Sequence, residues 1–240
     1  MVLILKKRYL LIAVAVLAAT VAMMLTVRNH PIRAAFSALS GEEEPLLILD
    51  AGHGGEDGGA VSADGVAESG INLAIAQKAE LLFTFLGYDT MLTRPGEDAI
   101  YSPEAQTLRE KKVSDLKNRV ALVNAAQRGT LISIHQNSLP AHSKVHGAQV
   151  FYNTVAPAQE MAQSIQETLN QLVNPGNDKA AKAIDGTIYL MKEITKPGIL
   201  VECGFLSNPT EAQQLQQESY QTKLAVAIVS GYLQYTGTKE

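Results

Sequence analysis

The sequence predicts a single α/β domain, with a twisted, mostly parallel sheet flanked by helices, preceded by an N-terminal transmembrane helix. From Pro45 onward, short apolar runs typical of buried strands alternate with segments of helical periodicity, and this alternation favours a mainly parallel sheet. Before that point lies a long uncharged apolar segment. We therefore expect a basic N-terminus and anchor helix over residues 1–27, a linker over 28–44 and a folded domain over 45–237.

The N-terminal segment has the length and the flanking charges of a membrane anchor. Residues 9–27 form a run of 19 uncharged positions, close to the number that a helix needs to cross the hydrocarbon core. The basic residues 6–8 (KKR) favour an N-terminus inside the cell, although Arg28 and Arg33 weaken the charge bias. A membrane-anchored domain on the outer side is therefore expected. Small residues within the segment leave a cleaved signal peptide as the alternative.

The composition excludes several classes of protein. The formal net charge of −4 gives no electrostatic case for a nucleic-acid partner, because such proteins usually present a basic face. Cys203 is the only cysteine, so the chain forms neither an intrachain disulfide nor a cysteine-rich zinc site. Any metal must be held by histidine and carboxylate side chains.

The first strand begins at Leu46 and runs into a glycine-rich loop that contains His53. The strand is apolar without alternation, which is typical of a strand buried on both faces. The loop lacks the Lys-Ser/Thr of a phosphate-binding loop, and the next helical pattern begins only near Ile71, too late for a dinucleotide fingerprint. A nucleotide site is therefore disfavoured. The loop is either a tight turn with a solvated histidine or a place where His53 holds a ligand.

Periodicity assigns the remaining elements in order. Residues 71–86 carry a helical apolar stripe, and Gly87 follows it as a C-terminal cap would. Asn208, Pro209 and Glu211 have the N-cap, first-turn proline and third-position acid of a helix start. The other expected strands cover residues 88–93, 130–135, 148–152, 188–191 and 199–203, and the other expected helices cover residues 116–123, 157–172 and 224–232.

Three polar side chains lie at or near the carboxyl ends of expected strands, the edge of such a sheet where ligands collect. His53 follows the first strand, His135 ends the third, and Glu202 lies near the end of the last. A charged glutamate in so apolar a strand would be costly to bury without a cation or strong donors. Each residue alone has a structural explanation, but together they predict a metal site.

Zinc in a hydrolase typically takes three protein ligands and leaves a position for water. Two histidines then require one acid as the third ligand. Glu68 is favoured because the start of a helix can hold it opposite His53, whereas the loop acids Glu56, Asp57 and Asp64 are weaker candidates. Glu202 becomes the general base that moves a proton from water to the leaving amine.

A second histidine pair has the spacing of helical metal ligands. His142 and His146 are four residues apart, but Pro140 and Gly147 bracket them in a short polar loop. We expect both histidines to be surface residues.

Four motifs, in order, resemble those of the zinc-dependent N-acetylmuramoyl-L-alanine amidases of the amidase_3 family. They are residues 49–55 (LDAGHGG), 68–74 (ESGINLA), 133–137 (SIHQN) and 201–208 (VECGFLSN), and the resemblance covers essentially all of 45–235. Transferred by position, it implies zinc on His53, Glu68 and His135, with Glu202 as the catalytic acid/base. Members of this family cleave the amide between the lactyl group of N-acetylmuramic acid and L-alanine in peptidoglycan.

The short membrane-anchored build, without wall-binding repeats, is most similar to CwlD-type amidases of spore-forming bacteria. That likeness implies action on spore cortex, where peptide removal prepares muramic acid for conversion to muramic-δ-lactam, with a role in germination. Only residues 139–147 separate the third motif from the next strand, which argues against the inserted autoinhibitory helix of some division amidases.

Two other functions stay open at this stage. One is a catalytically inactive, membrane-tethered wall-binding module, against which the four intact site positions argue. The other is a zinc peptidase acting on another substrate, which shares the metal chemistry. Whether a regulatory protein partner is required also stays open.

Overall fold

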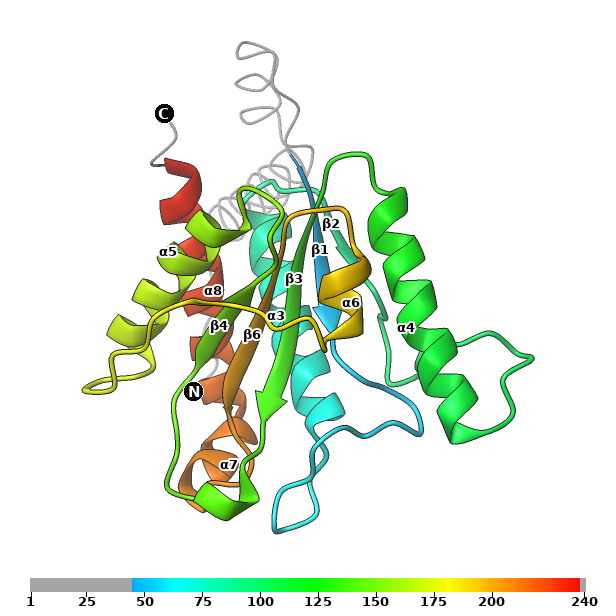
Figure 1. The fold of residues 1–240 in the computed structure, drawn as a ribbon. Helices are drawn as coiled ribbons and strands as arrows, with labels where there is room; N and C mark the ends of the chain where they lie inside the picture. The colour runs from blue at the N-terminus through cyan, green and yellow to red at the C-terminus, as the bar shows by residue number, and fades with distance from the viewer. Residues whose placement is uncertain (1–44, 238–240) are drawn as a thin grey trace, which may run out of the picture. The chain divides into compact units, whose positions relative to one another are not determined.

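The computed structural model describes residues 45–237, which form one compact unit with a six-stranded sheet at its centre (Figure 1). In chain order the strands are β1 (Leu46–Ala51), β2 (Thr90–Leu92), β3 (Gly129–Asn137), β4 (Gln149–Tyr152), β5 (Lys182–Ala183) and β6 (Gly198–Phe205). Their order across the sheet is β2-β1-β3-β6-β4-β5. The three strands that carry the expected site residues or lead into them are therefore neighbours at the centre.

The sheet is mixed rather than wholly parallel. Every neighbouring pair of strands is parallel except one. The exception is β4 with β6, which pair antiparallel through Gln149–Glu202 and Tyr152–Ile199. The prediction of a mostly parallel sheet is confirmed in this form.

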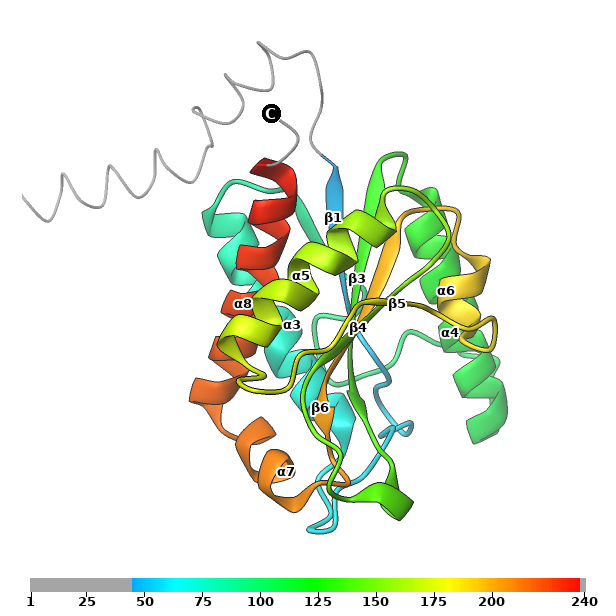
Figure 2. The ribbon, with the colours of Figure 1, turned by 60° about the vertical axis from the view of Figure 1, so that its left-hand side comes forward.

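Helices cover both faces of the sheet, as the views in Figures 1 and 2 show. On one side lie α3 (Glu68–Phe85), α5 (Ala158–Leu172) and α8 (Glu218–Gly237), and on the other lie α4 (Leu108–Ala125) and α6 (Tyr189–Glu193). Two further short helices, η1 (Pro140–His142) and α7 (Pro209–Leu215), follow β3 and β6. Side chains of β1 alternate between two apolar clusters: Leu47 and Leu49 pack in the larger one, and Ile48 packs with α4 and α6. Alternate strand residues therefore face opposite sides of the sheet, and this decides which of them can line a site on the side of α4 and α6.

The helix ends follow the sequence signals. Asn208 caps α7 by accepting hydrogen bonds from the backbone N–H groups of Thr210 and Glu211, as expected. Gly87 follows α3 with a φ of 91°, a left-handed conformation that glycine adopts without strain.

The strand predicted over residues 188–191 is wrong, because this segment forms helix α6. The buried positions are Leu190, Met191 and Ile194, a one-sided helical spacing rather than the alternation of a strand. The helix packs against α4 and the sheet, so tertiary contacts override a short apolar run whose periodicity is ambiguous. The position of α6 beside the site makes this correction important for function.

The expected anchor helix (residues 9–27) and linker (28–44) lie outside the described residues. Within residues 45–237, no helix combines the length and apolar character required to cross a bilayer.

Candidate metal centre and active site

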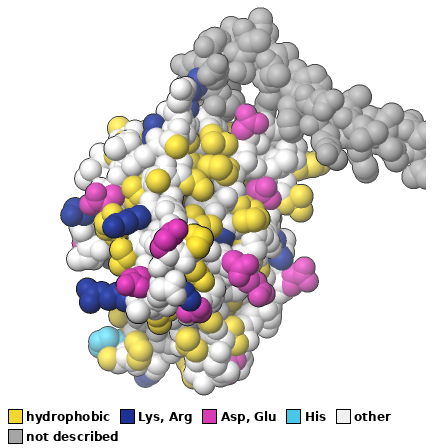
Figure 3. Space-filling view, turned by 90° about the vertical axis from the view of Figure 1, so that its right-hand side faces the viewer, with side chains coloured by type: hydrophobic (Ala, Val, Ile, Leu, Met, Phe, Trp, Pro, Cys, Tyr) yellow, Lys and Arg dark blue, Asp and Glu magenta, His cyan; other side chains and the backbone are white. Residues whose placement is uncertain are grey.

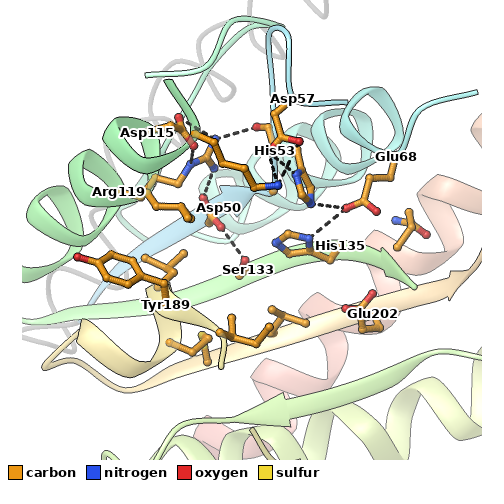
Figure 4. Close-up of a pocket in the computed structure, with 18 of the residues that line it drawn as sticks. Asp50, His53, Asp57, Glu68, Asp115, Arg119, Ser133, His135, Tyr189 and Glu202 are labelled. Atoms are coloured by element: carbon orange, nitrogen blue, oxygen red, sulfur yellow. Dashed lines mark hydrogen bonds and ion pairs between the residues drawn. The ribbon is translucent and has the colours of Figure 1, made fainter. Parts of the chain in front are cut away.

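His53, Glu68 and His135 meet at the carboxyl end of the sheet (Figure 4). His53 follows β1, Glu68 is the first residue of α3, and His135 lies on β3. The Glu68 Oε1 atom lies 2.9 Å from His53 Nε2 and 3.1 Å from His135 Nδ1. One potential ligand atom from each residue lies within 4.8 Å of the others. The structure thus brings together the three residues that the sequence proposed as metal ligands.

Glycines create the space that these side chains occupy. A Cβ atom on Gly52 would overlap the His135 ring, and one on Gly59 would collide with Glu68 and His53. His53 itself has a φ of 61°, an uncommon left-handed conformation for a residue with a side chain. The glycine-rich loop is therefore required by close packing around the imidazole groups.

Glu68 is held in place from several directions. Its Oε2 accepts a hydrogen bond from the Ala60 N–H at 2.9 Å, and its Oε1 accepts one from Asn72 Nδ2 at 3.2 Å. Burial by itself would raise the pKa of this carboxyl, but hydrogen bonds and charge interactions with His135 and His53 outweigh it and lower the pKa well below its usual range. Glu68 is therefore ionised, as a metal ligand must be.

Asp57 is not in the cluster of ligand atoms but orients one of its members. The His53 Nδ1–H can donate to Asp57 Oδ2 at 2.9 Å, which leaves Nε2 facing Glu68. Lys112 on α4 pairs with the same Asp57 oxygen at 3.1 Å. A carboxylate behind a metal-binding histidine commonly sets its tautomer and ring orientation. The sequence had suggested Asp57 only as a weaker ligand candidate.

Glu202 lies on β6 beside the cluster. It is the register partner of His135 on the neighbouring parallel strand. Its Oε2 atom is shielded from solvent, and no described residue donates a hydrogen bond to it. Burial raises the pKa of Glu202 to about 7, with nearby Glu68 adding to the rise and the histidines opposing it. A carboxyl with a pKa near neutrality is suited to accept and return a proton.

Arg119 and Asp50 form a buried ion pair that no sequence pattern indicates. Arg119 Nη1 lies 2.5 Å from Asp50 Oδ1, and its Nε donates to Asp115 Oδ2 at 2.7 Å. The guanidinium also donates to the carbonyl oxygens of Ala51 and His53 at 2.8 and 2.7 Å. A basic residue on α4 thereby fixes the backbone of the histidine loop. In the sequence, Arg119 stands among the apolar residues of the helix expected over 116–123, and this position was the one sign that its side chain could be buried.

Arg94 holds the same loop through further hydrogen bonds. It donates to the carbonyl oxygens of Ala51, Gly52 and Ser69 at 2.9, 3.2 and 2.8 Å. Two buried guanidinium groups therefore satisfy the loop carbonyls that the turn leaves without strand partners.

The other sequence candidates lie away from the cluster. His142 and His146 are exposed, as expected. Glu56 pairs with Lys111 at the surface, and Asp64 accepts a hydrogen bond from Ser62. Seen from the side of α4, the surface mixes basic and acidic side chains and has no patch of one sign (Figure 3).

The donor set fits a divalent metal ion. Two imidazole nitrogens and one carboxylate oxygen converge, with a further carboxylate beside them. This set is typical of catalytic zinc, which keeps one position open for water. The cluster could therefore hold zinc, with His53, Glu68 and His135 as ligands.

Comparisons with known proteins agree with this arrangement. A family model described as Amidase_3, N-acetylmuramoyl-L-alanine amidase, matches residues 47–234. The germination-specific N-acetylmuramoyl-L-alanine amidase of Bacillus subtilis (strain 168) is 38% identical over 191 residues, which is 79% of each chain. The amidase LytC of the same organism is 31% identical over 193 residues, covering 79% of this chain and 35% of LytC.

Two solved structures extend the likeness to the fold. The CwlD amidase from Clostridioides difficile, in complex with the GerS lipoprotein, has a TM-score of 0.77 and 39% identity, covering 81% of this chain and all of that one. An N-acetylmuramoyl-L-alanine amidase from Clostridium difficile 630 has a TM-score of 0.70 and 29% identity, covering 82% of this chain and 99% of that one.

Proposed function

The chain belongs to the N-acetylmuramoyl-L-alanine amidase family Amidase_3, and from this premise we propose that it is a zinc-dependent enzyme acting on spore-cortex peptidoglycan. As an amidase of this family, it hydrolyses the amide that joins N-acetylmuramic acid to the L-alanine of the stem peptide. The observation that carries the zinc proposal is the convergence of His53, Glu68 and His135 beside Glu202.

In this proposal, His53 Nε2, His135 Nδ1 and the Glu68 carboxylate hold the metal. Bound zinc supplies a Lewis acid that polarises the amide carbonyl and lowers the pKa of water. Asp57 keeps the His53 ring in the orientation that points Nε2 into the cluster. The Gly52 and Gly59 positions leave room for the ring and carboxylate that must approach each other.

Glu202 performs the proton transfers. Its Oε2 takes a proton from the attacking water as the water oxygen bonds to the amide carbon. It then returns the proton to the alanine nitrogen as the carbon–nitrogen bond breaks. The products are a free lactyl carboxylate on the sugar and a free amino terminus on the peptide. The shielded, unpartnered oxygen of Glu202 supports this role.

Product analysis on purified peptidoglycan tests the reaction. We expect new alanine amino termini and peptide-free glycan, detected by mass spectrometry, from the zinc-loaded protein and not from a Glu202→Gln control. Products cleaved within the peptide would favour the zinc peptidase instead. Binding to peptidoglycan without any released product would favour the inactive wall-binding module.

The spore role rests on the germination-specific relative and on the CwlD likeness. We infer that removal of stem peptides by this enzyme prepares muramic acid for conversion to muramic-δ-lactam. Deleting the gene is expected to leave cortex without the lactam while vegetative growth continues. A normal lactam content in the deletion strain would reject the cortex role and leave the amidase activity standing.

We also propose that residues 9–27 anchor the protein in a membrane with its domain on the outer side, where peptidoglycan lies. The uncharged segment and its basic flank support this placement. Protease added to intact protoplasts should remove the domain, and a protected domain would reverse the topology.

A protein partner is the last part of the proposal. The CwlD relative was solved in complex with a lipoprotein, GerS. We propose that a lipoprotein also binds this chain, and affinity capture from sporulating membranes should recover one in stoichiometric amount. If the full-length chain is recovered without a lipoprotein, the proposed partner is rejected.

A further inference from the structure

The cavity beside the metal cluster continues along the sheet between α4 and α6. Its volume is about 360 Å³, within the ~300–1,000 Å³ range of small-molecule sites. His53, Glu68, His135 and Glu202 line one end, and Tyr189 lies on the α6 side (Figure 4). A substrate cleaved at the cluster can therefore extend one of its two halves into this space.

The wall of the cavity toward α6 is apolar and ends in an aromatic ring. Leu116 of α4 and Leu190 and Met191 of α6 line it, together with Leu200 of β6. Tyr189 lines the same cavity, and 40% of its surface is exposed although the next two residues of its helix are buried. An exposed aromatic ring over an apolar wall offers a flat contact surface for a ring with apolar faces.

The charges that line the cavity disfavour an anionic occupant. Its lining contains five carboxylates, from Asp50, Asp57, Glu68, Asp115 and Glu202, and two fixed cations, Lys112 and Arg119. Both cations are already paired with acids of the same lining. With these carboxylates ionised, the lining would keep a net negative charge even with a divalent ion at the cluster.

The two halves of the substrate differ in their charge. The stem peptide carries at least its terminal carboxylate, whereas the N-acetylmuramoyl half is an uncharged sugar once its lactyl group is bound as an amide. We propose that the cavity between α4 and α6 binds the sugar half, with Tyr189 as the surface on which the pyranose ring packs. This inference rests on the proposed amidase function and names the half of the substrate that this wall recognises.

A cycle of two enzymes and two substrates tests the proposal. The substrates are an N-acetylmuramoyl peptide and the matching lactoyl peptide, which has the same amide and peptide but no sugar ring. The enzymes are the zinc-loaded full-length wild type and Tyr189→Ala. The variant should lower kcat/KM for the muramoyl peptide by roughly threefold to tenfold, as expected for one aromatic contact, and should leave kcat/KM for the lactoyl peptide unchanged.

Two controls keep the cycle informative. Tyr189→Phe retains the ring and should behave as wild type on both substrates, so a loss in this variant would contradict a ring-packing role. Calorimetry with a peptide-free disaccharide of N-acetylglucosamine and N-acetylmuramic acid, in which the lactyl carboxyl is reduced to an alcohol so that the ligand is uncharged, measures binding without turnover. Its affinity should fall in Tyr189→Ala by the same factor as kcat/KM for the muramoyl peptide.

Equal losses on both substrates, or no loss on either, would overturn the sugar assignment. Unchanged affinity for the disaccharide would overturn it as well. Failure of the proposed function gives a different result, because the wild type would then release no amine from the muramoyl peptide.

Discussion

His135 on β3 and Glu202 on β6 are register partners on neighbouring parallel strands. Residues paired in this way project their side chains to the same face of a sheet. The pairing therefore places a potential metal ligand and a potential general base side by side without any contribution from a loop. Loop and helix residues supply only the other two ligands.

We expect His135→Ala to lose stoichiometric zinc, because removing one of three ligands leaves an incomplete site. The matched control is His142→Ala, which removes an exposed histidine outside the cluster and should retain one zinc per chain. Metal content after dialysis, measured by atomic emission, distinguishes them. Full zinc retention in His135→Ala would sink the ligand assignment.

The Glu202→Gln variant should bind zinc normally yet lose most activity. The amide preserves the shape of the side chain but cannot accept the proton of the attacking water. Loss of a general base commonly lowers the rate by about 10²–10⁴-fold. Turnover should be compared with the wild type at equal zinc content, and near-normal turnover would assign the proton transfer to another group.

Gly52→Ala should weaken zinc binding by roughly 10–100-fold, because its new Cβ would occupy the position of the His135 ring. Gly70→Ala is the matched control, since no atom lies within 4 Å of its added Cβ and alanine favours its helix. Competition with a chromogenic chelator gives both affinities. Equal affinities would mean that the ring can move aside.

Arg119→Met should lower the free energy of unfolding by about 3–5 kcal/mol, because it leaves Asp50 buried without its cation. Arg109→Met, on the exposed face of the same helix, should change it little. Urea unfolding of the two variants at neutral pH measures this difference. A similar midpoint for both would show that the pair is dispensable for stability.

Acid should destabilise the fold partly through Asp50. Burial would raise the pKa of this carboxyl, but Arg119 and hydrogen bonds from Ser133 and Thr93 outweigh it and lower the pKa below its usual value. A lowered folded-state pKa contributes stability above the unfolded-state pKa, about 3.9, and this contribution is lost as pH falls through the folded-state value. Urea unfolding between pH 7 and 3 should give a shallower acid slope for Asp50→Asn than for the wild type. Identical slopes would contradict this role.

The sequence by itself determined the central strands and the residues at their ends. The apolar run of β1 and that of β6, broken only by Glu202, are typical of strands buried in the middle of a sheet. Because parallel strands end at one edge, the polar residues that follow or end these runs had to meet there. The choice of Glu68 over the neighbouring loop acids depended on family resemblance as well as on the position of a helix start.

Tertiary structure decided what local patterns leave ambiguous. A short apolar run around Leu190 fits a strand or a buried helix equally well, and only its packing against α4 and the sheet selects the helix. Likewise, nothing in the spacing of Asp50 and Arg119 reveals that they pair across the domain, 69 residues apart. The position of Tyr189 beside the cavity follows from α6. Local sequence encodes periodicity and end signals, whereas such pairings depend on how distant elements pack, which no local pattern encodes.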